Sequence, residues 1–310
     1  MTDILIGVDG GGSKTRVVVG DEMGNELARA EGGRSAVQPG KAEASAKVIA
    51  EVVREALSQA AMEGSVEPKV LYCGVAGVGR DVEQRSLQSA LEAEELAEEV
   101  VVEGDGAIAL FDAFADGAGI LIVSGTGSIA YGRGPSGNTV RCGGWGPDIG
   151  DEGSGAWIGR RALAIVAAAT DGRERETALV GAILTATQTD DALGLIPWAA
   201  SADVRAVSQL APVVLATANA GDARANSLVT LAAEELVTHV RSLAIQLFGD
   251  ERASISVAAS GGLMRKGSLL RKRVEQRLRS AVPGAKLRQE EVVPERGALR
   301  AAARRIRLPI

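Results

Sequence analysis

One aspartate stands where a proton acceptor would be useful. Asp105 follows an apolar run, Val100-Val101-Val102, and precedes a helical pattern that continues through Ile108 and Leu110. A carboxylate at the carboxyl end of a strand lies where open sheets bind ligands. There it could accept the proton of an attacking hydroxyl during phosphoryl transfer. The position also suits a helix N-cap, so Asp105 is predicted to be a general base, a cap, or both.

The single histidine of the chain is a weaker candidate for that proton. His239 lies in an apolar helical pattern beside Val237 and Val240. This setting favours a structural role over catalysis. General-base chemistry is therefore assigned to a carboxylate.

A glycine-rich loop follows the first predicted strand. Residues 9–15 read DGGGSKT and come directly after ILIGV. Glycines let backbone N–H groups point at phosphate oxygens, and a carboxylate at a strand end is a ligand for Mg²⁺. The spacing fits neither a Walker loop nor a dinucleotide motif, and a plain tight turn is the alternative. We expect Asp9 to bind Mg²⁺ and expect phosphate contacts from Gly10, Gly11, Gly12, Ser13, Lys14 and Thr15.

Two more glycine turns follow predicted strands in the second half of the chain. Residues 124–128 read SGTGS, and this loop could hold phosphate through Gly125, Thr126 and Gly127. Gly261 and Gly262 follow the predicted strand 255–259, where a turn without side chains would let an adenine or ribose approach the backbone. A simple strand-to-helix connection is the alternative for this last turn.

The least regular segment combines glycines, acids and tryptophans. Residues 142–159 read CGGWGPDIGDEGSGAWIG, and we expect no regular structure up to Gly153. Carboxylates accept hydrogen bonds from sugar hydroxyls, and an indole covers the apolar face of a sugar ring. Trp145 is a candidate for such a contact, whereas Trp157 begins a helical apolar pattern and is predicted to be core. The carboxylates of the segment are Asp148, Asp151 and Glu152.

The elements that must position these residues repeat within the chain. Residues 4–20 and 120–132 share one plan of apolar strand, glycine loop and second strand, and Gly24-Asn25 and Gly137-Asn138 supply equivalent turns. Between the repeats, helical and strand patterns alternate, which indicates mixed sheets covered by helices. More helix follows, notably over residues 228–248. The sequence thus predicts a duplicated α/β protein with its domain boundary near residues 117–119.

Composition limits the partners. The 310 residues carry a net charge of −6, which argues against nucleic acid as the main partner, and the basic stretch 265–307 is read as a solvated helix face. No apolar run approaches the roughly 18 residues of a membrane span, and the N-terminus lacks a signal-peptide pattern. Two cysteines are too few for a disulfide scaffold. A cytoplasmic protein with no membrane partner is expected.

Taken together, these segments resemble the N-acetylglucosamine kinase family, within the BadF/BadG/BcrA/BcrD-type ATPases of the actin-like sugar kinase superfamily. The matching motifs are GVDGGGSKT at 7–15, VSGTGS at 123–128, CGGWGPDIGDEGS at 142–154, SGG at 260–262 and PERGA at 294–298. The resemblance implies a duplicated actin-like, ribonuclease H-like α/β fold with two mixed-sheet domains around a central cleft. We expect domains at 1–117 and 118–294, with the C-terminal helix 295–310 as a candidate addition to the first.

The resemblance also implies an activity and its residues. The family uses ATP and Mg²⁺ to phosphorylate the 6-hydroxyl of an amino sugar, here N-acetylglucosamine or glucosamine, and a homodimer is expected. Its catalytic aspartate matches Asp105, and its phosphate motifs match residues 9–15 and 125–128. Its adenosine motif matches Gly261 and Gly262. Its sugar contacts match Ser128, Gly144, Trp145 and Asp151.

One departure from the family concerns the sugar. The family places a sugar-holding asparagine after paired glycines, and this chain has Ala36 near that place after Gly32-Gly33. Ser35 and Gln38 are the candidate substitutes. Losing such a hydrogen bond would cost about 1–3 kcal/mol or change the preferred sugar.

Two other functions fit parts of the sequence. Activator ATPases of radical acyl-CoA enzymes hold an iron–sulfur cluster between two subunits through cysteines, which Cys73 and Cys142 superficially allow. However, Cys73 lies in a predicted buried strand, where a thiol acts as a small hydrophobe, and the acidic tryptophan segment has no role in electron transfer. A non-catalytic sugar or nucleotide sensor is the other alternative, although no helix-turn-helix pattern flanks the predicted core.

Overall fold

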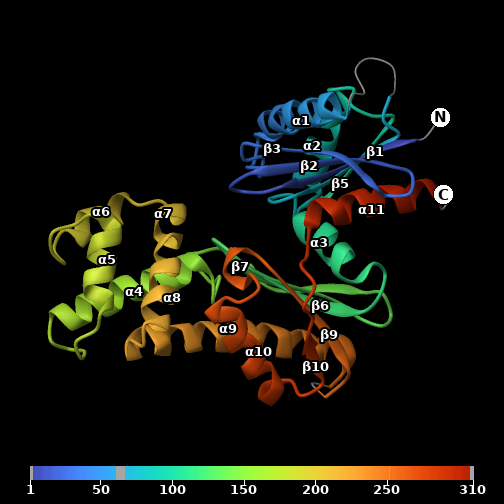
Figure 1. Ribbon diagram of the computed structural model, residues 1–310. Coiled ribbons are helices and arrows are strands. Elements are labelled where there is room, and N and C mark those ends of the chain that lie inside the picture. Colours follow the sequence, from blue (N-terminus) through green and yellow to red (C-terminus); the bar gives the residue numbers. More distant parts are fainter. Residues whose placement is uncertain (1–2, 61–66, 251, 308–310) are drawn as a thin grey trace. The chain divides into compact units, whose positions relative to one another are not determined.

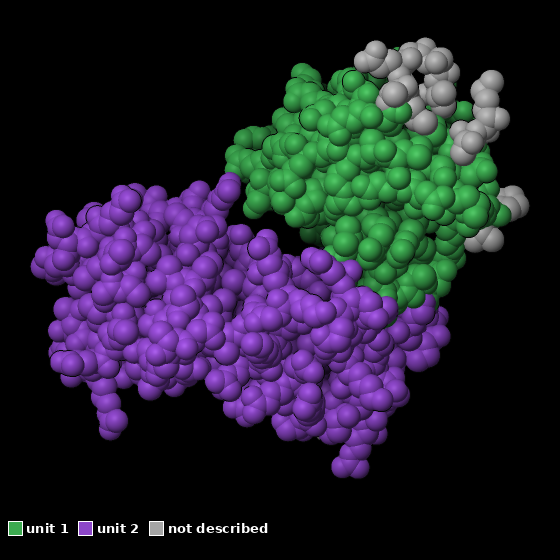
Figure 2. Space-filling view, viewed as in Figure 1, with its two compact units in different colours: residues 1–116, 292–310 green, residues 117–291 purple. Residues whose placement is uncertain are grey.

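The computed structural model describes residues 3–60, 67–250 and 252–307 (Figure 1). The chain forms two compact units, which Figure 2 distinguishes by colour. Unit 1 comprises Met1–Asp116 and Val292–Ile310, and unit 2 comprises Gly117–Glu291. The ranges expected from the sequence, 1–117 and 118–294, differ by one residue at the first junction and by three at the second. Residues 308–310 of the expected C-terminal helix lie outside the described residues.

Unit 1 is a mixed sheet with helices on both faces. Its strands and helices are β1 (Ile4–Gly10), β2 (Thr15–Asp21), β3 (Glu26–Gly32), α1 (Ala42–Gln59), β4 (Val70–Val75), α2 (Asp81–Glu92), β5 (Glu99–Gly104), α3 (Asp105–Phe114) and α11 (Pro294–Arg307). The sheet order is β3-β2-β1-β4-β5. Strand β2 pairs antiparallel with both β1 and β3. Strand β4 pairs parallel with both β1 and β5. The carboxyl ends of these three parallel strands therefore meet at one edge.

The two faces of this sheet bury different clusters. Helices α1 and α2 cover one face, where Ile6, Val8 and Ile49 are fully buried. Helix α11 packs across β1 on the other face. Gly7 makes this close packing possible, because a Cβ there would lie 2.4 Å from the backbone nitrogen of Leu299. Helix α11 thus completes the core on this face of β1.

Unit 2 contains a second sheet and a larger set of helices. Its elements are β6 (Gly119–Ser124), β7 (Ser128–Arg133), β8 (Thr139–Gly143), α4 (Gly155–Thr170), α5 (Leu179–Thr187), α6 (Leu195–Ser201), α7 (Val204–Ser208), α8 (Leu210–Asn219), α9 (Ala223–Phe248), β9 (Ile255–Ser260), the 3₁₀ helix η1 (Gly262–Met264), α10 (Leu269–Ala281) and β10 (Ala285–Leu287). The sheet order is β10-β9-β6-β7-β8. Helix α9 packs on the sheet and joins it to the cluster formed by α4, α5 and α8.

The two sheets have the same topology. In each, a central strand pairs antiparallel with the next strand of a meander and parallel with a strand that follows a helix. Gly24 and Gly137 occupy equivalent turns with φ of +80° and +84°. The predicted duplicated two-domain α/β fold is therefore confirmed. The segment expected to be irregular begins slightly later than predicted, because Cys142 and Gly143 still pair with β7.

The membrane prediction can be compared with the helices directly. Within residues 3–60, 67–250 and 252–307, no helix combines the length and apolarity needed to cross a bilayer.

Candidate functional site

Asp105 lies at the carboxyl edge of the unit 1 sheet, directly after β5, and is the first residue of α3. Its carboxylate accepts a hydrogen bond from the backbone N–H of Gly106 at 2.9 Å. The helix N-cap is Gly104, whose extended backbone precedes the helix, so the N-cap alternative for Asp105 is wrong. Burial raises the pKa of Asp105 above its usual range. A carboxylate with a raised pKa is a better proton acceptor.

Asp9 lies at the same edge, near the end of β1. Burial raises the pKa of Asp9 to about 7, and the charge of Glu295 adds to this. The guanidinium of Arg16, 3.3 Å away, opposes the rise, while the charge of Asp105 favours it. A cation bound here would stabilise the ionised carboxylate. The residues present therefore fit Mg²⁺, which proteins commonly hold through one or two carboxylates together with phosphates and water.

The loop between β1 and β2 is a tight turn with an exposed tip. The backbone N–H of Gly11 donates to the carbonyl of Lys14 at 2.9 Å, and Gly12 and Ser13 are exposed. Lys14 forms an ion pair with Glu31 at 2.7 Å. Thr15 is fully buried, and its hydroxyl donates to the Gly33 carbonyl at 2.6 Å. The tip is thus free to meet a ligand, whereas the Thr15 hydroxyl is engaged within the protein.

The segment carrying Ala36 is attached to this loop. The backbone N–H groups of Ser35 and Ala36 both donate to the Gly11 carbonyl at 3.2 Å. The Ser35 side chain is 1% exposed and lies 2.6 Å from the Thr15 hydroxyl. Gln38 instead lines a cavity of about 810 Å³ together with residues of α1 and α2. The backbone of Ala36 is therefore fixed beside the turn, whereas Ser35 is buried against Thr15 and Gln38 lines a separate cavity.

In unit 2, two of the predicted nucleotide loops lie together. Gly261 has φ of +97°, and a Cβ there would lie 2.2 Å from the carbonyl oxygen of Ser124. The backbone nitrogen of Gly262 lies 4.0 Å from a Cβ built on Gly125. Helix α4 also begins against this loop, because the N–H groups of Gly155 and Ala156 donate to the carbonyls of Gly125 and Thr126. The turn after β9 and the loop after β6 thus form one glycine-lined surface.

Residues 144–154, here called the acidic loop, connect β8 to α4 and rest on that surface. Oδ1 of Asp151 accepts a hydrogen bond from the Gly146 N–H at 3.0 Å. Asp151 has φ of +56°, an uncommon conformation for a non-glycine residue. The Ser128 hydroxyl donates to the Glu152 carbonyl at 2.7 Å. Burial raises the pKa of Asp151. The loop is therefore closed on itself and fixed to the end of β7.

Two arginines that were not predicted from the sequence as site residues also hold the acidic loop. Arg160 on α4 donates to the Pro147 carbonyl and pairs with Asp148 at 3.0 Å. Arg141 on β8 donates to the Gly143 carbonyl at 2.8 Å. An arginine on a helix or edge strand has the pattern of a solvent-facing residue, so composition and periodicity gave no signal for these contacts.

The two tryptophans of this region differ in burial. Trp145 is 64% exposed, with the Arg141 guanidinium 5.0 Å from its ring centroid. Trp157 packs against the unit 2 core, and Arg161 covers its ring at 4.2 Å. Trp145 is thus available to cover a ligand, and Trp157 is structural.

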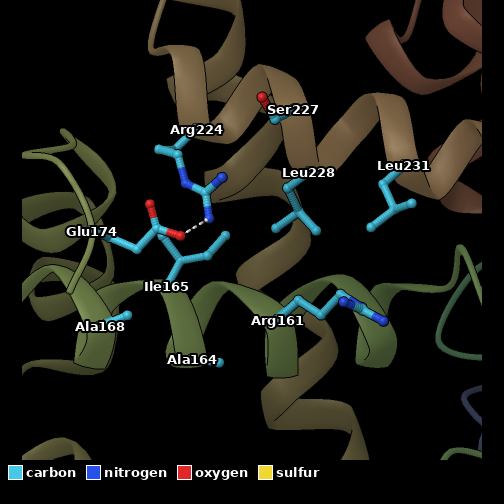
Figure 3. Close-up of a pocket in the computed structure, with 9 residues that line it drawn as sticks. All are labelled: Arg161, Ala164, Ile165, Ala168, Glu174, Arg224, Ser227, Leu228 and Leu231. Carbon is cyan, nitrogen blue, oxygen red and sulfur yellow. Dashed lines mark hydrogen bonds and ion pairs between the residues drawn. The ribbon is translucent and has the colours of Figure 1, made fainter.

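A separate cavity of about 290 Å³ lies between α4 and α9 (Figure 3). Apolar side chains such as Ile165 and Leu228 line it, and Arg224 pairs with Glu174 at its margin at 2.6 Å. None of the residues predicted to bind sugar, nucleotide or metal lines this cavity.

Known proteins resemble this chain in sequence and in fold. The chain is 30% identical over 263 residues to the N-acetylmuramic acid/N-acetylglucosamine kinase of Clostridium acetobutylicum, covering 84% of this chain and 85% of the relative. It is 29% identical to the N-acetyl-D-glucosamine kinase of Dictyostelium discoideum, covering 96% of each chain. A crystal structure of a proposed N-acetylglucosamine kinase from Chromobacterium violaceum superposes with a TM-score of 0.80 at 31% identity, over 96% of this chain and 98% of that one.

A more distant structure shares the fold alone. The ROK family glucokinase of Streptomyces griseus matches with a TM-score of 0.62 at 18% identity, over 97% of this chain and 99% of that one. The model of the BadF/BadG/BcrA/BcrD ATPase family matches residues 6–302. Because this match spans both units, the resemblance seen in the motifs is confirmed, and the chain belongs to the BadF/BadG/BcrA/BcrD ATPase family.

Proposed function

We propose that the chain is an ATP-dependent kinase that phosphorylates the 6-hydroxyl of an amino sugar, N-acetylglucosamine or glucosamine. The observation that carries the proposal is Asp105, a carboxylate of raised pKa at the carboxyl edge of a parallel sheet. Three curated relatives support it, because each is named as a kinase of N-acetylglucosamine, N-acetylmuramic acid or glucosamine.

Unit 1 is assigned the proton acceptor and the metal. Asp105 would orient the sugar hydroxyl and accept its proton while the phosphoryl group is transferred. Asp9 would hold Mg²⁺, which supplies charge neutralisation for the phosphates of ATP. Residues 10–15 would contact those phosphates, chiefly through the exposed tip at Gly12 and Ser13. Thr15 would act from within the protein by fixing the turn.

Unit 2 is assigned the remaining nucleotide contacts and most of the sugar contacts. Gly125, Thr126 and Gly127 would contact phosphate, and Gly261 with Gly262 would face the adenosine. In the acidic loop, Gly144, Trp145 and Asp151, together with Ser128, would bind the sugar. The hydrogen bonds that already fix this loop support the assignment, because a preorganised site loses less entropy when it binds. The proposal includes a cytoplasmic location and a homodimer. Light scattering on the purified chain would test the homodimer.

The alternative of a radical-enzyme activator fits the site less well. Cys73 is fully buried in β4, and burial raises its thiol pKa far above the usual range. A thiolate ligand for a cluster shared between subunits must reach the surface. The acidic loop, by contrast, presents hydroxyl-binding groups that a sugar kinase would use.

A coupled assay of ADP formation tests the proposal directly. The purified chain with ATP and Mg²⁺ would be offered N-acetylglucosamine, glucosamine, N-acetylmuramic acid and glucose. We expect an amino sugar to give the highest kcat/KM and expect the product to carry its phosphate on the 6-oxygen, as read by phosphorus NMR. Turnover that needs no sugar, or that favours glucose over every amino sugar, would refute the proposal.

A further inference from the structure

His239 is buried against the acidic loop rather than in the core. It lies on α9 and is 8% exposed, and its neighbours on that helix, Val237 and Val240, face the hydrophobic cluster of unit 2. The imidazole instead meets the two ends of the connection between β8 and α4. It is the one histidine in the sequence.

The first contact is with Gly143, the last residue of β8. A methyl group built on Gly143 would lie 2.9 Å from Cε1 of His239, 3.1 Å from Nε2 and 3.4 Å from Nδ1. The ring therefore lies flat against the glycine. Gly143 has φ of +74°, where glycine is favoured. The ring and the turn are matched in shape, so the start of the acidic loop rests on the imidazole.

The second contact is with Glu152, near the other end of the loop. Nε2 of His239 lies 3.7 Å from Oε2 of Glu152. The same carboxylate reaches Gly150, because a methyl group there would lie 3.3 Å from Oε2. The backbone of Glu152 is fixed from the opposite side by Ser128. The His239 side chain thus lies against Gly143, directly before the acidic loop, and near Glu152 toward the other end of that loop.

The chemistry of the ring fits this position. Burial lowers the pKa of His239, while the charges of Glu152, Glu235 and Asp151 oppose that shift. Burial thus favours the neutral imidazole, and Nε2 lies 3.7 Å from Oε2 of Glu152. Nδ1 is buried and has no hydrogen-bond partner among the described residues. A buried polar atom without a partner destabilises a fold, so the Nδ1 atom of His239 lowers stability at this position.

We propose that His239 is a positioning residue for sugar binding, which holds the acidic loop through Gly143 and Glu152. The proposal rests on the proposed function, because it assigns the sugar contacts to that loop. His239 itself does not touch the substrate or the reacting atoms.

The single histidine makes the test direct. With ¹⁵N-labelled histidine, the imidazole signals of the chain arise from His239 alone and need no assignment. We expect N-acetylglucosamine to shift these signals more than Mg²⁺ and ADP do. Unchanged imidazole signals at a sugar concentration that supports full turnover would overturn the proposal, and they would leave the proposed function intact.

Kinetics of variants provide a second measurement. His239→Gln keeps an N–H donor for Glu152, whereas His239→Phe keeps a ring of similar shape without one. We expect His239→Phe to raise the KM for the sugar roughly 5- to 50-fold with a smaller change in kcat and in the KM for ATP, and expect His239→Gln to recover part of the loss. Equal sugar KM values for wild type and His239→Phe would show that the ring only fills space.

Two carboxylate variants serve as a matched pair. Both Glu152 and Glu235 raise the imidazole pKa, but Glu152 belongs to the acidic loop and Glu235 to α9 itself. Glu152→Gln and Glu235→Gln should therefore both lower the imidazole pKa in the NMR titration. Glu152→Gln alone should raise the sugar KM. An equal effect of both variants on the sugar KM would assign that effect to charge rather than to loop positioning and would overturn the proposal.

Discussion

Oδ1 of Asp151 accepts a hydrogen bond from the Gly146 N–H at 3.0 Å, while its other oxygen, Oδ2, lies 2.6 Å from where a Cβ on Gly127 would be. One carboxylate thus closes the acidic loop and also packs on the predicted phosphate loop after β6. The two loops cannot change shape independently at this point.

Gly127→Ala should therefore weaken sugar binding from within the phosphate loop. The added methyl group would displace the Asp151 carboxylate, and we expect the KM for the sugar to rise roughly 10- to 100-fold. Gly125→Ala is the matched control, because its methyl group would have 4.0 Å to the nearest atom, Gly262 N. Steady-state kinetics with both substrates separate the two. A sugar KM unaffected by Gly127→Ala would mean that Asp151 does not bind the sugar.

Asp105→Asn tests the proton acceptor. The amide oxygen can still accept the Gly106 hydrogen bond, so the fold should be kept, but the amide cannot take a proton. We expect kcat to fall roughly 10²- to 10⁴-fold, with sugar binding measured by calorimetry little changed. Turnover within a few-fold of wild type would exclude Asp105 as the base.

Asp9→Asn should stabilise the protein in the absence of ligands at alkaline pH. The folded-state pKa of Asp9 is raised to about 7 from 3.8, so the folded state binds this proton more tightly than the unfolded state does. Stability from this group is present at low pH and is lost as the pH rises through about 7. At pH 8 the amide should therefore add on the order of 1–4 kcal/mol to the free energy of unfolding, less any loss from the Arg16 ion pair.

Urea denaturation at pH 5 and pH 8 measures this effect. The gain from Asp9→Asn should be larger at pH 8, and activity with ATP and Mg²⁺ should be lost. Asp81→Asn, at an exposed position at the start of α2, is the control and should change stability by less than about 0.5 kcal/mol. If Asp9→Asn lowered the free energy of unfolding at pH 8, this would contradict the prediction that burying the ionised carboxylate of Asp9 is unfavourable.

Ala36→Asn tests the departure from the family at the sugar. Ala36 is fixed beside the first phosphate loop through the Gly11 carbonyl, so an asparagine there would start from a defined backbone. We expect a gain of about 1–3 kcal/mol in binding of N-acetylglucosamine, which is roughly a 5- to 150-fold lower dissociation constant. Gln38→Ala should leave the dissociation constant for N-acetylglucosamine unchanged, because Gln38 lines the cavity beside α1 and α2. Weaker binding in Gln38→Ala would instead identify Gln38 as the substitute.

Much of this architecture could be predicted from local patterns. Runs such as residues 4–8 and 120–123 are apolar and β-branched, and the glycine turns that follow them recur in both halves, so the duplicated strands were predictable. The carboxyl end of β5 was equally clear, which located Asp105. Contacts between segments distant in sequence were not predictable. Glu295 is 2% exposed and pairs with Arg29, 266 positions earlier, and no local pattern indicates that its charge acts on Asp9.

The path of the acidic loop also could not be predicted from the sequence. Its composition predicted an irregular segment, but its closure depends on the positive φ of Asp151 and on arginines from β8 and α4. The assignment of His239 as structural was made from the apolar pattern of α9. That pattern identifies which side of the helix is buried but not which segment covers it.

The packing of α11 on β1 has a consequence for synthesis on the ribosome. Strand β1 is covered by α11, which follows all of unit 2 in the sequence, so Leu5 and Val18 gain their apolar neighbour Leu299 only after unit 2 has been translated. Unit 2, which is continuous in sequence, can fold earlier. A nascent chain stalled before Pro294 should therefore expose the α11 face of the first sheet to chaperones, even though every strand of that sheet has already been translated.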